Sequence, residues 1–166
     1  MRSDTLKVRT FKPTCFEDFR GEIYTTWSKE PHKGAFYPKL NFCHDKFSRS
    51  RKHVLRGFHG DERTWKLISC VYGDIFLAVV DNCPHSDTYL QVETFTISDR
   101  NKLQVLVPPG FGNAHLVMSD EAVFHYKLAY DGEYSDVDLQ FVIKWNDPRL
   151  KVEWPINNPI LYGRDR

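Results

Sequence analysis

A short basic segment, residues 54–66, carries the side chains with the clearest capacity for chemistry. Its sequence, VLRGFHGDERTWK, brings Arg56, His59 and Lys66 close together along the chain. An imidazole can take up or release a proton near neutral pH, and an ammonium group can stabilise an anion that forms beside it. The segment therefore predicts proton transfer next to a developing negative charge. The plainer alternative is a basic hairpin with a solvated histidine.

The elements that hold these residues decide whether the side chains can meet. Strict alternation along a strand would put Arg56 and His59 on opposite sides, so a bulge or kink at Gly57 is needed to aim both the same way. Lys66 begins a run with largely apolar residues on both faces. It either points into the mouth of a barrel or caps the strand end and extends to water.

Two residues further along the chain each have an ordinary structural role to weigh first. Tyr126 shares the apolar face of the run 122–130, where a buried tyrosine usually just forms a hydrogen bond through its hydroxyl. Asp147 precedes a proline, which is typical of a turn. Its carboxylate could instead orient a histidine and raise the basicity of the ring.

The segment VPPGFGNAH, residues 107–115, bears on whether the protein has a metal site. Its prolines and glycines indicate a turn that brings the chain back into the sheet. In metal-binding β-barrels of the cupin type, a histidine pair and a later histidine after a PxG turn converge on the ion. Here Asn113 stands at the later position, and His59 has no histidine two residues on. We therefore expect no metal, and His115 is the residue that could restore a site.

Length and composition predict one β-rich domain spanning residues 1–166. The chain is 41% hydrophobic and 14% aromatic, which is enough apolar surface for one sizeable core. Short β-type runs separated by Gly, Pro, Asn and Asp favour an antiparallel sandwich or barrel over a parallel sheet. The run 74–82 is apolar at both parities and should be a central strand. The expected strands are 22–27, 39–47, 53–58, 65–72, 74–82, 91–97, 103–107, 122–130 and 139–145.

Charge, cysteine spacing and hydropathy exclude several classes of protein. The net charge of +1 from 23 basic and 22 acidic residues predicts no nucleic-acid partner. Four cysteines without a CxxC pair indicate reduced thiols rather than a zinc site or a disulfide framework. No run approaches the roughly 20 apolar residues of a membrane span, and the N-terminus lacks the apolar core of a signal peptide. We expect a cytoplasmic protein with no membrane partner.

Several motifs taken together resemble one family, the dTDP-4-dehydrorhamnose 3,5-epimerases and their relatives. The match runs over nearly the whole chain, in order and with plausible spacing. It rests on FRGEI (19–23), VLRGFHG (54–60), WKLISCVYGDIFLAVVD (65–81), PPGFGNAH (108–115), HYKLAY (125–130) and WNDPRLKVEWP (145–155). The resemblance implies a double-sheet jelly roll of the cupin superfamily with short peripheral helical turns. It also implies a homodimer that shares an N-terminal strand, and catalysis without a metal or organic cofactor.

The resemblance further implies a substrate and roles for individual residues. The substrate would be a nucleoside-diphosphate 4-keto-6-deoxy sugar, epimerised at C3, C5 or both. His59 resembles the general base, Asp147 the carboxylate that orients it, and Tyr126 the donor on the opposite face. Lys66 matches a lysine near the ketone oxygen. Two arginines match those that hold the substrate and its diphosphate, namely Arg20 and Arg56.

The chain also departs from the family pattern at substrate-contacting positions. His44 and Lys46 stand where relatives commonly have Gln and Asn, so contacts to the sugar or nucleotide should differ. A histidine of the family turn falls on Asn113, and His115 is a potential replacement. The motifs HGDERTWKL and FGNAHLVMSD look more like the branch that acts on GDP-linked 4-keto-6-deoxy heptoses in capsule synthesis.

Three other functions remain open on the sequence. A metal-dependent cupin enzyme would carry a stoichiometric ion, whereas the epimerase would not. A non-catalytic jelly roll that binds sugar nucleotides would not need His59 or Tyr126. A 3,4-ketoisomerase on the same fold would move the carbonyl instead of inverting a centre.

Overall fold

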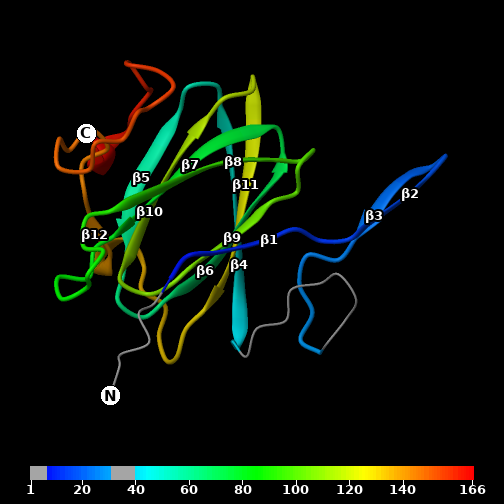
Figure 1. The fold of residues 1–166 in the computed structure, drawn as a ribbon, viewed down its shortest axis with the longest axis horizontal. Helices are drawn as coiled ribbons and strands as arrows, with labels where there is room; N and C mark the ends of the chain where they lie inside the picture. Colours follow the sequence, from blue (N-terminus) through cyan, green and yellow to red (C-terminus); the bar gives the residue numbers. More distant parts are fainter. Residues whose placement is uncertain (1–6, 31–39) are drawn as a thin grey trace.

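Two five-stranded sheets face each other in the computed structural model, which describes residues 7–30 and 40–166 (Figure 1). All strand pairs in these sheets are antiparallel. The first sheet has the order β1 (Arg9–Phe11), β9 (Gln104–Val107), β6 (Trp65–Tyr72), β11 (Glu121–Ala129) and β4 (Phe42–Arg51). The second has the order β12 (Phe141–Val142), β5 (Leu55–Gly60), β10 (Phe111–Val117), β7 (Asp74–Asp81) and β8 (Val92–Ser98).

The remaining elements lie outside the two sheets. A hairpin of β2 (Cys15–Asp18) and β3 (Gly21–Tyr24) extends away from the sheets in Figure 1. Two short 3-10 turns follow β11, at Val137–Leu139 and Gly163–Asp165. None of the helical segments in the described ranges is long and apolar enough to cross a membrane. The predicted antiparallel double-sheet fold with short helical turns is confirmed, while a single domain over residues 1–166 stays a prediction.

The main core lies between the two sheets and explains the apolar central strand. Alternate residues of β7, among them Ile75, Leu77 and Val79, point inward and are fully buried. The next residues, including Ala78 and Val80, pack on the other side against segments that follow β12. Because β7 is covered on both faces and lies between β10 and β8, its sequence lacks polar alternation, as predicted.

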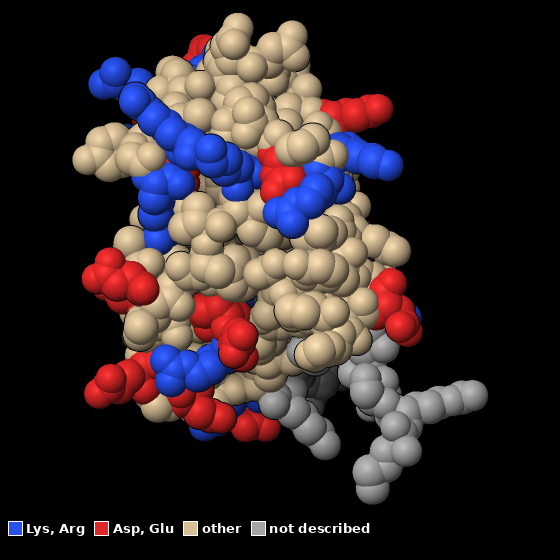
Figure 2. Space-filling view, turned by 90° about the vertical axis from the view of Figure 1, so that its left-hand side faces the viewer, with Lys and Arg blue, Asp and Glu red and all other residues tan. Residues whose placement is uncertain are grey.

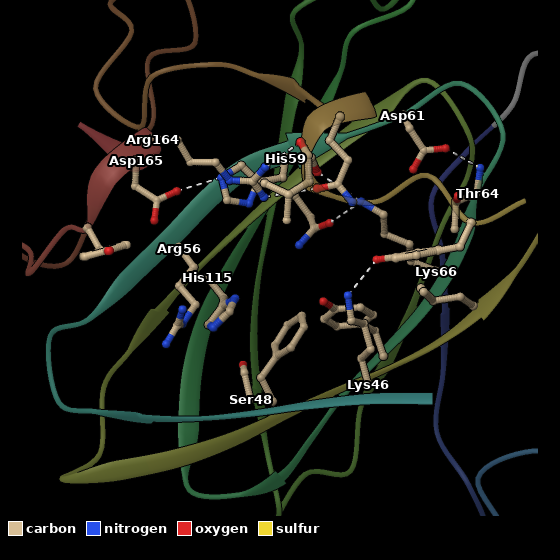
Figure 3. Close-up of a pocket in the computed structure, with 18 residues that line it drawn as sticks. Lys46, Ser48, Arg56, His59, Asp61, Thr64, Lys66, His115, Arg164 and Asp165 are labelled. Carbon is tan, nitrogen blue, oxygen red and sulfur yellow. Dashed lines mark hydrogen bonds and ion pairs between the residues drawn. The ribbon is translucent and has the colours of Figure 1, made fainter. Parts of the chain in front are cut away.

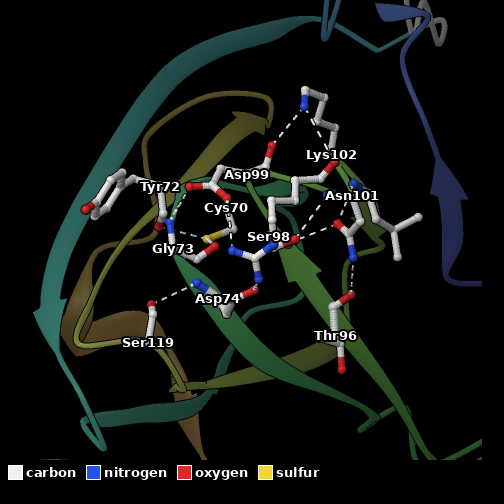
Figure 4. A network of polar contacts seen from close by, with 12 residues as sticks. Cys70, Tyr72, Gly73, Asp74, Thr96, Ser98, Asp99, Asn101, Lys102 and Ser119 are labelled. Atoms are coloured by element: carbon white, nitrogen blue, oxygen red, sulfur yellow. Dashed lines mark hydrogen bonds and ion pairs between the residues drawn. The ribbon is translucent and has the colours of Figure 1, made fainter.

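One end of the barrel is tied together by a polar network around the turn between β6 and β7 (Figure 4). The backbone N–H of Gly73 donates to Asp99 Oδ2 at 2.8 Å, and that of Asp74 donates to Ser119 Oγ at 2.9 Å. The buried Cys70 thiol donates to the carbonyl of Gly73. Burial raises the pKa of this thiol to about 11. All four cysteines are free, as predicted.

The structure corrects the predicted elements at three places. Residues 111–115, expected in a turn, belong to β10, because they pair with β7 in a continuous antiparallel ladder. The expected strand 139–145 is reduced to β12, because the chain turns away to cover the sheet. The short strands β1 and β2 were not expected. Lys39, at the start of one predicted strand, lies outside the described residues.

A bulge in β5 resolves the parity problem around Gly57. His59 pairs with Asn113 and Arg56 pairs with His115, so a three-residue step on β5 faces a two-residue step on β10. Gly57 has φ +115°, and a Cβ there would lie 2.3 Å from the carbonyl oxygen of Asn113. The expected bulge is confirmed, and it turns Arg56 and His59 toward the same cavity.

Gly57→Ala should therefore cost much more stability than an alanine at a roomy left-handed glycine. Gly132 also has positive φ, but a Cβ there would meet nothing within 4 Å. We expect Gly132→Ala to lower the free energy of unfolding by about 1 kcal/mol, and Gly57→Ala by about 3 kcal/mol or more. Urea unfolding at equilibrium measures both. Equal losses would contradict the close approach of β5 to β10.

Candidate active site

A cavity of about 480 Å³ lies between the two sheets (Figure 3). Both sheets and the C-terminal segment line it. Along three of the lining strands, every second residue faces the cavity, as a regular pleated strand requires, whereas β5 lines it through Arg56 and His59 across its bulge. These alternate pairs are Lys46 and Ser48 on β4, Asn113 and His115 on β10, and Phe124 and Tyr126 on β11.

His59 is held by a carboxylate from the end of the chain. Its Nε2 lies 2.7 Å from Oδ1 of Asp165, which also accepts the backbone N–H of Gly57 at 3.2 Å. Burial would raise the pKa of Asp165, but the contacts with His59 and Gly57 outweigh it and lower that pKa. The carboxylate is therefore ionised at neutral pH and fixes the orientation of the imidazole.

The prediction that Asp147 orients His59 is wrong. Its carboxylate pairs with Arg149, at 2.6 Å from Nη2, and accepts the backbone N–H of the same residue. These bonds to Arg149 lower the pKa of Asp147 to about 2. Asp147 closes its own turn, the ordinary role of an Asp before a proline. The sequence analysis missed Asp165, because the residue lies far from His59 in the sequence and no motif connects the two.

Lys66 points into the cavity rather than to water, which decides between the two predicted positions. The residue is 7% exposed, and its Nζ donates to the carbonyl of His59 and to Oδ1 of Asn113, both at 3.1 Å. Burial lowers the pKa of Lys66 to about 8, against an opposing effect of the nearby Asp61. At neutral pH the amine is still mostly a cation, held beside the histidine.

Tyr126 faces the cavity from the sheet opposite to that of His59. It lies on β11 of the first sheet, whereas His59 lies on β5 of the second. Burial raises the pKa of Tyr126, partly offset by Lys46, so the phenol keeps its proton at neutral pH. The two groups thus line one cavity from its two walls.

Aromatic side chains gather beside Lys46 at the cavity. Lys46 Nζ donates to the hydroxyl of Tyr134 at 2.9 Å, and the ring of His44 lies 4.7 Å from that of Tyr134. His44 Nδ1 is also 3.2 Å from the hydroxyl of Tyr130. Lys46 and Tyr134 line the cavity, whereas His44 stands behind them. We call the rings of His44, Tyr130 and Tyr134, together with the Lys46 side chain that Tyr134 binds, the aromatic cluster.

The charge inside the cavity is mainly positive, although the whole chain is nearly neutral. The cationic lining residues are Lys46, Arg56, Lys66 and Arg164, and the carboxylates are Asp61 and Asp165. On the outer face that carries the C-terminal segment, basic side chains gather toward one end and acidic ones toward the other (Figure 2). The cavity is therefore suited to an anionic ligand.

Arg20 is one of two predicted substrate-binding residues that do not line the cavity. It lies between β2 and β3, is exposed and pairs with Asp18. The second is His44, whereas Arg56, Lys46, Asn113 and His115 all line the cavity. Across residues 7–30 and 40–166, no group of three His, Cys, Asp or Glu side chains is arranged to hold a metal ion.

Comparisons with known sequences agree on one family. Residues 4–166 match the family model described as dTDP-4-dehydrorhamnose 3,5-epimerase. A protein of that name from Shigella flexneri is 33% identical over 168 residues, covering 99% of this chain and 91% of the relative. Its namesake from Escherichia coli (strain K12) is 33% identical over 158 residues, covering 93% and 84%.

Solved structures show the same likeness. A dTDP-6-deoxy-D-glucose-3,5-epimerase from Legionella pneumophila Philadelphia 1, in complex with dTDP-4-keto-L-rhamnose, has a TM-score of 0.84 and 32% identity. The match covers 95% of this chain and 84% of that one. A 4-keto-6-deoxy sugar epimerase from the novobiocin gene cluster of Streptomyces spheroides has a TM-score of 0.83 and 27% identity, covering 98% and 82%.

Proposed function

The chain belongs to the dTDP-4-dehydrorhamnose 3,5-epimerase family and is therefore a nucleotide-sugar epimerase, and from this premise we propose how its cavity inverts a sugar. The substrate is a nucleoside-diphosphate 4-keto-6-deoxy sugar, inverted at C3, C5 or both. The observation that carries the proposal is that His59 and Tyr126 line one cavity from opposite sheets, with Lys66 buried beside them. Inversion needs a base and an acid on opposite faces of the reacting carbon.

His59 removes the proton next to the ketone. We assign the ring proton to Nε2, which lies 2.7 Å from Oδ1 of Asp165, and the free electron pair to Nδ1. The C–H bond breaks, the proton passes to Nδ1, and the electron pair moves toward the ketone oxygen. Asp165 stabilises the imidazolium that forms.

Lys66 stabilises the negative charge that develops on the ketone oxygen. Its buried ammonium group sits in a site of low dielectric, where a fixed positive charge acts more strongly than in water. With a pKa of about 8, it can also share a proton with the oxygen more readily than an ordinary lysine. Its bond to Asn113 keeps the side chain aimed across the cavity.

Tyr126 returns a proton to the opposite face of the same carbon. The phenol O–H bond breaks and a new C–H bond forms, which leaves the centre inverted. Solvent then restores the proton on Tyr126 and removes the one on His59. The raised pKa of Tyr126 keeps the phenol protonated before this step.

The cationic lining and the aromatic cluster are placed to bind the nucleotide. Arg56, Lys46 and Arg164 supply donors for the diphosphate, and a guanidinium can bind two phosphate oxygens at once. Relatives are named for dTDP-linked sugars, which makes dTDP the first candidate. His44 and Lys46 motivate the second candidate, a GDP-linked heptose. Crystals soaked with dTDP and with GDP would show which base is ordered beside His44.

Arg20 contributes to catalysis through a homodimer. The β2–β3 hairpin stands off the sheets and exposes Phe19 and Ile23, which are 98% and 73% exposed. Apolar side chains on a projecting hairpin are better buried against another subunit than left in water. A second copy of the chain would cover them and receive Arg20 at its own cavity.

Heavy water tests the proposed reaction. Incubated with 4-keto nucleotide sugars in D₂O, the protein should incorporate deuterium at a carbon flanking the ketone and give an inverted product by NMR. His59→Ala should slow incorporation about 100-fold or more. Tyr126→Phe should impair inversion more than exchange, because His59 still removes the proton. No incorporation with any sugar of a dTDP- and GDP-linked panel would contradict the proposal, and a moved carbonyl would indicate a ketoisomerase.

Mixing two inactive variants tests whether Arg20 acts across a dimer. Arg20→Ala and His59→Ala should each be strongly impaired alone. After exchange of subunits, a hybrid dimer would hold one site with both residues intact, so the mixture should regain activity. Sedimentation should show a dimer. A monomer at micromolar concentration, or no recovery in a mixture that does form hybrids, would contradict the role of Arg20.

A further inference from the structure

The cavity has a second level of side chains, of which the proposed function uses only Arg56. Cross-strand pairing aligns Tyr126 with Lys46 and Asn113 with His59, which forms the level of the reacting groups. Two residues further along β11 and β10, Phe124 pairs with Ser48 and His115 pairs with Arg56. We call Ser48, Arg56, His115 and Phe124 the second tier. It lies about 6.6 Å along the strands from the first.

His115 is a buried polar side chain with unused bonding capacity. The residue is 4% exposed, and its ring stacks on Phe124 with centroids 4.1 Å apart and planes 9° from parallel. Its Nε2 is buried without a hydrogen-bond partner among the described residues. Ser48 Oγ is likewise buried and unpaired within the described chain. Both residues line the cavity (Figure 3).

Unpaired polar atoms are expensive to bury, so two of them in residues that line a cavity point to a ligand as the partner. An apolar side chain in place of His115 would stack on Phe124 equally well and avoid this cost. The stacking fixes the plane of the ring. Burial with the nearby charges of Arg56 and His59 lowers the pKa of His115 to about 3, although Asp165 opposes this. The ring is therefore neutral and offers one donor and one acceptor.

The neighbours of His115 define the chemistry of its partner. A neutral imidazole and a serine hydroxyl can each donate or accept, which matches a hydroxyl group better than a phosphate or a carboxylate. Arg56 is partly occupied, because its Nε donates to Ser50 Oγ at 3.1 Å. Arg56 also lines the cavity, and its remaining N–H groups can donate to the same ligand oxygen or to the diphosphate.

We propose that His115 and Ser48 form a hydroxyl-binding subsite that selects 4-keto sugars with a hydroxylated substituent over those that end in a methyl group. The proposal rests on the proposed function, because it assumes that the sugar ring lies at the level of His59 and Tyr126. A substituent that reaches the second tier from the reacting carbon must extend beyond the sugar ring. A methyl group there would leave Nε2 and Oγ unpaired.

Binding of two unreactive ligands tests the subsite apart from catalysis. Both are nucleotide sugars whose ketone has been reduced to an alcohol. One ends in methyl and the other in a hydroxylated chain. Calorimetry with the wild type should show about tenfold or more preference for the hydroxylated ligand. His115→Phe keeps the flat ring on Phe124 but removes both nitrogens, and should bring the two affinities close together. Ser48→Ala should reduce the preference by a smaller factor.

Stability and a matched histidine provide the controls. Because His115→Phe removes a buried unpaired nitrogen, its melting temperature should equal or exceed that of the wild type. His85→Phe makes the same change at an exposed residue away from the cavity and should leave the preference intact. If His115→Phe fails to fold, Ser48→Ala still tests the subsite.

The outcomes separate the subsite from the reaction. Equal affinity of the wild type for both ligands, or a preference that survives in both variants, would overturn the subsite. A preference that is lost in His115→Phe but kept in His85→Phe would support it. If that pattern occurred without deuterium incorporation in any 4-keto sugar, the subsite would stand and the proposed epimerisation would be contradicted.

Discussion

The contact between His59 and Asp165 is the interaction on which the cavity depends. The histidine comes from a central region of the chain and the carboxylate from its second-last residue, so the contact closes the C-terminal segment over the second sheet. Asp165 also accepts the N–H of Gly57, at the bulge that turns His59 inward. One ionised carboxylate therefore holds both the imidazole and the backbone that presents it.

Burial shifts the pKa values of three cavity residues. Lys66 has a pKa near 8, His115 has one near 3, and Tyr126 has a raised pKa. At neutral pH these groups are a cation, a neutral hydrogen-bonding ring and an intact phenol. The same low-dielectric environment thus separates a group that stabilises charge from groups that donate or read a hydrogen bond.

Local patterns predicted most of the strands, the roles of the site residues came from the resemblance to a family of epimerases, and long-range packing decided the rest. Alternation placed Tyr126 on an apolar face and identified the central strand, and the need for a bulge at Gly57 followed from the parity of Arg56 and His59. Asp147 was the wrong carboxylate because a turn signal and a catalytic role can share the same residues in sequence. The partner Asp165 and the strand β10 depend on contacts between distant segments, which no local pattern encodes.

The most direct test of this account compares two carboxylates. If Asp165 orients His59, Asp165→Asn should lower the rate of deuterium incorporation about 100-fold, because the amide no longer fixes or stabilises the protonated ring. Asp147→Asn should stay within about threefold of the wild type, because Asp147 only closes its turn with Arg149. A large loss in Asp147→Asn with full activity in Asp165→Asn would contradict the account.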